Sequence, residues 1–310
     1  MTTITADLFP TSPLALRTAD PAKQARVRLF AAEQATAAAT VRDILLETLA
    51  ATRSLAERQA VMRTAHQEVT TWRYTLAARA TGRLGTGIAY SAERFRTPIT
   101  ASTTNYDRLG PVGRLRDGAT WDGPSHTYRG GTATPAYDAM ATYGKEAAAR
   151  FASEDIEGDV LQNWVELPDG RRVAGNRIIR GEAAHTIGAE LAARVAARGL
   201  DVSRMETGGD PMYTATPDPA NSDTLFAAAL QLLADPDLTP ADFVTARYLL
   251  FQAPRTKKGS DAVNRTFTVA AGAALLGHNA PALPADIDLR CYVLGQHTAT
   301  RLTHDQEPTR

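Results

Sequence analysis

The sequence predicts a mainly α-helical protein with one or two small β-hairpins, and three observations support this. Apolar residues recur at helical spacing in seven segments. Proline follows a capping residue at the start of some of them, as at Thr134-Pro135 and Thr239-Pro240. The alternation typical of paired strands is clear only on either side of the turn at 168–171.

The first part of the chain is expected to form two long helices behind a loose arm. Asp20-Pro21 is typical of a helix start and opens a helix over about 21–52, which allows one break. Ser54 and Glu57 form a capping-box sequence that opens a second helix, ending near Gly82. Two helices joined by so short a turn are expected to pack as an antiparallel hairpin.

The next fifty residues lack a sustained period and are rich in glycine, proline and turn residues. So long an irregular stretch is rare inside a compact domain, and we take it as the domain boundary. Five further helices are expected beyond it, together with the hairpin around 168–171. They cover about 134–152, 181–198, 222–234, 240–252 and 262–276, and a short helix or strand follows at 286–293.

The chain therefore divides into five predicted parts. They are an arm (1–19), a helical hairpin (20–82), an irregular connecting segment (83–131), a helical domain (132–296) and a polar C-terminal tail (297–310).

Composition excludes several classes of protein. The 310 residues are 44% hydrophobic and 22% charged, which is typical of a globular protein. Basic and acidic residues balance at 34 each, which argues against a general nucleic-acid or membrane-surface binder. The single Cys291 excludes an internal disulfide. With no signal-peptide pattern and no long apolar run, we expect a cytoplasmic protein without a membrane span.

One segment, Arg255–Arg265, carries the strongest chemical signal. It holds four cationic side chains and a single carboxylate, Asp261, around a Gly-Ser-Asp turn. Lys257 and Lys258 are two of only four lysines in the chain. A basic turn that feeds a helix N-terminus favours anions, because free N–H groups and the helix dipole both attract phosphate. The alternative is a solvated basic loop between two core helices.

The order of segments from Gly208 to Pro284 resembles the core of the Fic/Doc/AvrB (FIDO) superfamily. The resemblance covers about 80 residues: an extended strip at 208–217, two helices, the loop at 257–265, a further helix and a proline-containing loop. In that family the loop motif is H-x-F-x-D-G-N-x-x-R, or H-x-F-x-N-A-N-K-R in Doc. Here Lys257 takes the place of the histidine and Gly259 that of the phenylalanine, whereas Asp261, Ala262 and Arg265 match.

The resemblance implies a mainly α FIDO-like protein that transfers a nucleotidyl or phosphoryl group from an ATP-like nucleotide to a hydroxyl of a protein or small molecule. By it, Asp261 would hold Mg²⁺, Arg265 would grip phosphates, and Lys257 would replace the histidine base. We expect the ligand to be bound further by Lys258, Ser260, Gly209 and Tyr213, with the 208–217 strip covering it. The missing histidine equally fits an interaction protein that has lost catalysis.

Other patterns give rival interpretations. Gly277-His278 with Asp286 and Asp288 resembles the G-S…D-x-D signature of polymerase-β-type nucleotidyltransferases, whose carboxylates hold Mg²⁺. An N-cap aspartate with a second acid in the first helical turn explains the same pair. The run at 128–131, Tyr-Arg-Gly-Gly, resembles the arginine strand of some ADP-ribosyltransferases. The six histidines do not cluster, and His66 is expected to be an ordinary core or surface residue.

Overall fold

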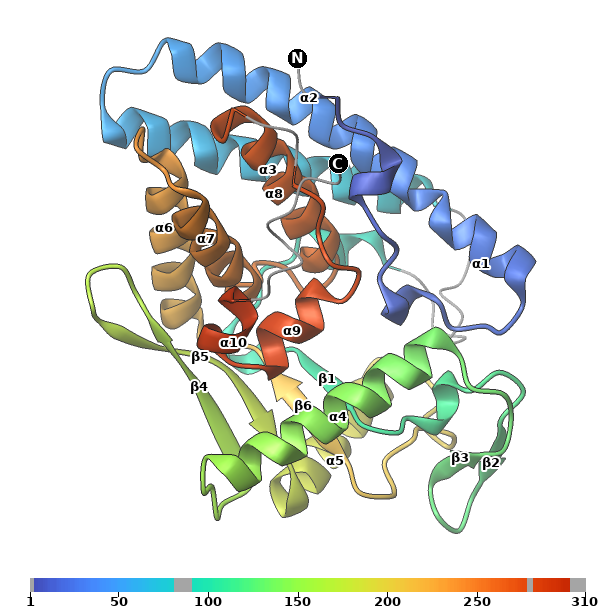
Figure 1. The fold of residues 1–310 in the computed structure, drawn as a ribbon. Helices are drawn as coiled ribbons and strands as arrows, with labels where there is room; N and C mark the ends of the chain where they lie inside the picture. Colours follow the sequence, from blue (N-terminus) through green and yellow to red (C-terminus); the bar gives the residue numbers. More distant parts are fainter. Residues whose placement is uncertain (1–2, 81–90, 278–280, 302–310) are drawn as a thin grey trace.

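A computed structural model describes residues 3–80, 91–277 and 281–301. The protein is mainly helical, as predicted. Figure 1 shows two layers: a group of long helices, and beneath it a small sheet with further helices around it. The helices are α1 (Pro21–Arg28), α2 (Phe30–Ala50), α3 (Leu55–Arg79), α4 (Pro135–Ser153), α5 (Gly181–Ala196), α6 (Pro219–Ala234), α7 (Pro240–Gln252), α8 (Ser260–Leu275), α9 (Ile287–Val293) and α10 (Gln296–Thr300).

Local signals place the N-terminal helices. The predicted break in the first helix falls at Leu29, between α1 and α2. The predicted capping box is present, because the Ser54 hydroxyl accepts from the Glu57 N–H and the Glu57 carboxylate accepts from the Ser54 N–H, at 3.2 and 3.1 Å. The two helices form the expected hairpin. The expected end at Gly82 lies outside the described residues, and α3 ends at Arg79.

The helical hairpin does not have a core of its own. Its buried residues pack with those of α6, α7 and α8 in one continuous apolar cluster, whose members include Leu45, Met62, Leu230, Leu249 and Phe267. The expected division between 20–82 and 132–296 therefore does not separate two cores. Helices from both ends of the chain are neighbours in Figure 1, and α8 packs against both α2 and α3.

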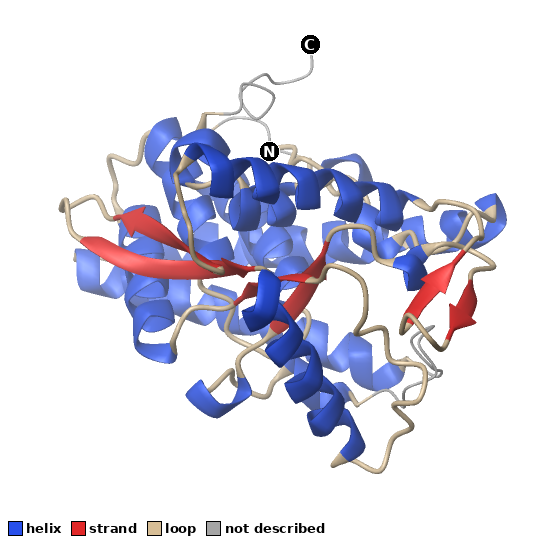
Figure 2. Cartoon of the chain, turned by 90° about the horizontal axis from the view of Figure 1, so that it is seen from below, coloured by secondary structure: helices blue, strands red, loops and turns tan. Residues whose placement is uncertain are grey.

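A four-stranded antiparallel sheet forms the second layer, with strand order β1-β6-β5-β4. The strands are β1 (Tyr106–Leu109), β4 (Val160–Glu166), β5 (Arg172–Ile179) and β6 (Met212–Ala215). One face packs on α4 and α9 through Leu109 and Ile178, and the other packs on α5 through Ile179 and Tyr213. Helices thus lie on both sides of this sheet, as Figure 2 shows.

The sheet is larger than the sequence predicts. The β4–β5 hairpin was expected, but β1 and β6 pair across more than a hundred residues of sequence. The segment expected to be an irregular connector contains β1 and a second hairpin, β2 (Thr120–Asp122) and β3 (Thr127–Arg129). Its described part is therefore integrated into the fold, and residues 81–90 lie outside the description.

Helix bounds elsewhere agree with the predictions to within a few residues. The largest shift is at α6, which begins at Pro219, because Asp218-Pro219 supplies the earlier start. The 286–293 segment is a helix, and a short helix, α10, occupies the start of the expected loose tail. In the part of the chain that is described, no helix has both the length and the apolar character needed to cross a bilayer.

Candidate functional site

The basic loop, residues 255–259, is held in place by the segment before β1. The Lys257 N–H donates to the Thr97 carbonyl at 3.0 Å, and the Ile99 N–H donates to the Arg255 carbonyl at 3.3 Å. The hydroxyl of Thr256 donates to the Lys258 carbonyl at 2.9 Å. The backbone of the loop is therefore hydrogen-bonded to a neighbouring segment, and the loop lies between the core helices α7 and α8.

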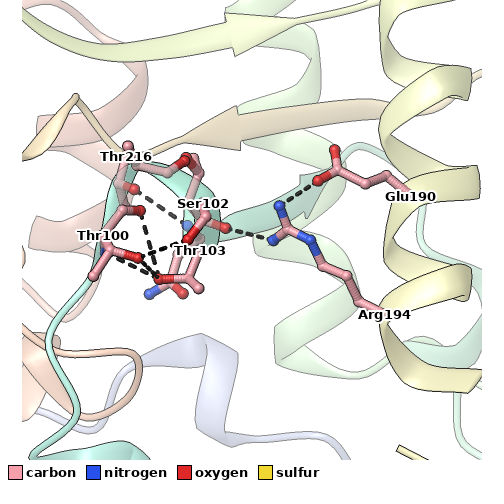
Figure 3. A network of polar contacts seen from close by, with 9 residues as sticks. Thr100, Ser102, Thr103, Glu190, Arg194 and Thr216 are labelled. Atoms are coloured by element: carbon pink, nitrogen blue, oxygen red, sulfur yellow. Dashed lines mark hydrogen bonds and ion pairs between the residues drawn. The ribbon is translucent and has the colours of Figure 1, made fainter. Parts of the chain in front are cut away.

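A network of polar contacts anchors the segment that pairs with this loop. Figure 3 shows Arg194 of α5 pointing toward the threonine-rich turn at 100–104. Arg194 donates to the Thr104 carbonyl at 3.0 Å and forms an ion pair with Glu190. Next to it, the Asn105 N–H donates to the Thr216 hydroxyl at 3.2 Å. The basic loop is thereby connected, through one segment, to α5 and β6.

Gly259 ends the basic loop and caps α8 in a left-handed conformation, with φ of +83°. A Cβ at this position would lie 2.6 Å from the Phe95 ring and 3.2 Å from the Arg73 side chain. We expect Gly259→Ala to lower the free energy of unfolding by at least about 1–2 kcal/mol, the cost of the left-handed conformation for an L-residue. Urea unfolding would measure this. Gly170→Ala is the control. Gly170 lies at the exposed hairpin turn with φ of +79° and open space around it, so its loss of stability measures the conformational cost alone.

Arg265 does not project into a ligand site. Its side chain is only 3% exposed. It donates to the Asp261 carboxylate at 2.7 Å, to the Pro284 and Ala285 carbonyls at 3.0 and 2.9 Å, and to Asp288 at 3.2 Å. The expected grip on phosphate is therefore corrected: each guanidinium nitrogen already donates within the protein, Nε to Asp261 in the same helix and the two terminal nitrogens to the segment before α9 and to Asp288. Asp261 is partly exposed, but it shares this ion pair.

Asp286 and Asp288 do not form a carboxylate pair. Asp286 accepts from Tyr143 at 2.8 Å and from Arg290 at 2.7 Å, beside a pocket of about 390 Å³. Asp288 is buried on the other side of the helix start and faces Arg265. The polymerase-β-type arrangement is thus not formed by these two residues, and its His278 lies outside the described residues.

The remaining expected ligand contacts are dispersed. Tyr213 is buried in the central strand β6 against α5, and Gly209 lies in the loop before that strand. The 208–217 strip was expected to cover the ligand at the basic loop. This expectation is corrected, because the 212–215 part of the strip is a strand inside the sheet. The Ser260 hydroxyl donates to the Thr256 carbonyl at 3.1 Å. Lys257 and Lys258 are both partly exposed.

Asp107, on β1, is the centre of a site that the sequence patterns did not indicate. Its side chain is exposed to solvent. Nevertheless, desolvation by the surrounding protein raises the pKa of its carboxyl, against the opposing charges of Arg17, Arg114, Lys258 and Arg94. Both observations hold for a side chain that water reaches but that protein surrounds on most sides. Water therefore reaches Asp107, although protein crowds it.

The four cations come from four separate segments and, with Asp107, make up what we call the basic recess. Arg17 follows a short 3₁₀ turn near the N-terminus, and Arg94 lies in the turn at 92–95. Arg114 lies in the turn at 113–115, and Lys258 lies in the basic loop, next to Gly259. Partial desolvation by the surrounding protein lowers the pKa of all four, although Arg17 and Arg114 are exposed to solvent, and the repulsion from Arg94 and Arg17 lowers the pKa of Lys258 further.

Among the described residues, few carboxylates other than Asp107 compensate this positive charge. Arg114 lies 3.7 Å from the Glu206 carboxylate, which also accepts from the Gly113 and Arg114 N–H groups. For the other three cations, no carboxylate of the described residues approaches within 4.0 Å. Four cations gathered in one partly desolvated place repel one another, so an anion that enters stabilises them.

A resident metal does not fit the described side chains. Across residues 3–80, 91–277 and 281–301, His, Cys, Asp and Glu side chains form no group of three suited to a metal ion. The carboxylate expected to hold Mg²⁺, Asp261, is already paired with Arg265. We therefore derive no step through a resident metal, and treat Mg²⁺ as part of a nucleotide substrate such as MgATP.

No protein-family model and no curated protein matches this sequence. Function is therefore argued from the residues. Of the expected site residues, only Lys258 takes part in the basic recess. The sequence signal that could have indicated Asp107 is its position two residues before Leu109. In a strand this spacing puts a charged side chain on the same face as an apolar one.

Proposed function

We propose that this protein binds a phosphorylated ligand of the nucleotide type in the basic recess and transfers a nucleotidyl or phosphoryl group from it to a hydroxyl. One observation supports this above all: Arg17, Arg94 and Lys258 all interact electrostatically with Asp107, and none of the three has an ion-pair partner among the described residues. Guanidinium and ammonium groups in such a place are suited to phosphate oxygens.

The FIDO-like order of segments remains part of this proposal. Helices α6 and α7, the basic loop and α8 follow in the order that the resemblance requires, and Lys258 belongs to both the loop and the recess. A second candidate is an interaction protein with a FIDO-like core that has lost catalysis. The observation that favours it is the internal use of Arg265, together with a lysine at the position of the histidine.

Binding of MgATP, ADP, AMP and pyrophosphate by isothermal titration tests the proposal. We expect affinity to follow the number of phosphates and to fall as salt is raised. Lys258→Ala and Arg17→Ala should each weaken MgATP binding about 10- to 100-fold, since a hydrogen bond to a charged group contributes about 1.5–3 kcal/mol.

The matched control is Arg171→Ala, an exposed arginine beside the β4–β5 turn that pairs only with Asp169 among its described neighbours. It should bind MgATP like the wild type. If the wild type binds none of the four ligands, or if both recess variants keep full affinity, the basic recess is not a phosphate site.

A further inference from the structure

A small pocket lies at the start of α6, where this helix meets the segment before β1 and the segment that follows α7. The Ile99 N–H donates to the Arg255 carbonyl at 3.3 Å, and the Arg255 guanidinium forms an ion pair with Asp223 of α6, so contacts within the protein join the three segments. The pocket has a volume of about 180 Å³ and is lined by four prolines, Ile99 and three polar residues, Ser222, Asp223 and Arg255. Because proline fixes φ, the pocket keeps its shape before a ligand enters.

Ser222 gives this pocket an unused hydrogen-bonding group. The residue is 6% exposed, and its hydroxyl has no hydrogen-bond partner among the described residues. A buried hydroxyl without a partner destabilises the fold, and most such groups in proteins are bonded to protein or to ordered water. Since Ser222 lines the pocket, a ligand that enters can supply the missing hydrogen bond.

The other lining residues determine which ligand fits. The side chains of Asp223 and Arg255 are 64% and 38% exposed, and they pair with each other at the rim. Because their charges cancel, the pocket favours a ligand without net charge. The proline and isoleucine walls are apolar, and proline rings pack well against aromatic rings. An apolar cavity of about 150 Å³ holds one benzene molecule. A pocket of about 180 Å³ therefore suits one six-membered ring with a small substituent.

We propose that this pocket binds a phenolic ring whose hydroxyl shares a hydrogen bond with Ser222. A phenol is uncharged at neutral pH, since its pKa is about 10. Its ring suits the proline walls, and its hydroxyl supplies the partner that Ser222 lacks. A small free phenol and the tyrosine side chain of a peptide present the same group. The site is independent of the basic recess, because none of the recess residues lines the pocket.

The test measures binding of phenol and of benzene, which differ only by the hydroxyl, to the full chain by saturation-transfer NMR titration. We expect phenol to bind the wild type with a Kd on the order of 0.1–1 mM, and benzene about 5- to 10-fold more weakly, because benzene leaves Ser222 without a partner. In Ser222→Ala this preference for phenol should disappear, while benzene keeps its wild-type affinity. A merely structural serine would leave the preference unchanged.

Ser153→Ala, which changes the exposed serine that ends α4, is the matched control and should keep the wild-type preference. Thermal unfolding checks that each variant retains its fold. N-acetyltyrosinamide distinguishes the two sources of the phenolic ring: tighter binding than phenol indicates the tyrosine of a peptide or protein, and weaker binding indicates a small free phenol. A wild type without a preference for phenol would overturn the proposal, and so would one that binds neither probe, as expected if water alone occupies the pocket. Retention of the preference in Ser222→Ala would do the same.

Discussion

Arg265→Ala should lower the free energy of unfolding by about 3–5 kcal/mol, because it leaves a buried carboxylate without its partner. The guanidinium is almost completely buried and joins α8 to Asp288 and to the carbonyls at 284 and 285. Removing it takes away both the opposite charge and the hydrogen bonds to those carbonyls. Urea unfolding, followed by far-UV circular dichroism, would measure the loss.

A second variant separates the buried charge from the lost contacts. In Arg265→Met with Asp288→Asn, the uncompensated carboxylate is removed as well, and we expect about 1–2 kcal/mol to be regained relative to Arg265→Met alone. Arg171→Ala, exposed on the β4–β5 turn, should change stability by no more than about 0.5 kcal/mol. A loss of the same small size in Arg265→Ala would show that the cluster does not hold α8 to α9.

The second large effect concerns His66 and pH. This residue is buried in the helical core between the rings of Phe226 and Phe267. Burial lowers the pKa of its imidazole from 6.5 to about 4, and the nearby Asn264 side chain opposes the shift. The folded protein therefore favours the neutral ring. The preference for the neutral ring stabilises the folded protein fully above pH 6.5. As the pH falls from 6.5 toward 4, about 3 kcal/mol of this stability is lost.

The contribution of Asp288 to stability changes with pH in the opposite direction, over an overlapping pH range. Burial and the nearby Asp261 raise the pKa of its carboxyl to about 7, against Arg265. The folded protein favours the protonated acid, so this contribution is present at low pH and is lost as the pH rises from 3.8 toward 7. In the wild type the two contributions oppose each other, so only single variants reveal them.

Urea unfolding of His66→Gln and of the wild type at pH 7, 6, 5 and 4.5 would measure the histidine contribution. The stability difference between them should shift by about 2–3 kcal/mol in favour of the variant over this range, because glutamine does not titrate. His185→Gln, on the exposed side of α5, is the control. A difference that stays constant with pH would show that water reaches His66 and that its ring is not desolvated.

The fold could be predicted from the sequence wherever the determining signals are local. Capping residues such as Ser54 and Thr239, and prolines at the first helical position, mark helix starts within a turn of the chain. The β4–β5 hairpin was predictable for the same reason. The pairing of Asp107 with Thr214 was not, since strands of four residues carry little periodicity and no local feature links segments so far apart.

The candidate site shows the same difference. Lys258 was identified because two adjacent lysines beside a glycine are visible in the sequence. Arg17, Arg94 and Arg114 were not, because the chain has thirty arginines and only the fold shows which of them meet. The sequence pattern wrongly assigned Arg265 to phosphate binding. An arginine in the first turns of a helix fits that role in sequence, but its burial and the carbonyls around it, which only the fold shows, determine what it binds.

The basic recess draws its members from Arg17 through to Lys258, and β1, which carries its carboxylate, has no partner until β6 is present. During synthesis, which proceeds from the N-terminus, Asp107 therefore emerges from the ribosome more than a hundred residues before the strand that fixes it. Fragments that end before residue 258 lack the lysine and cannot assemble the recess. Binding of the proposed phosphorylated ligand should thus appear in a single step, late in the growth of the nascent chain.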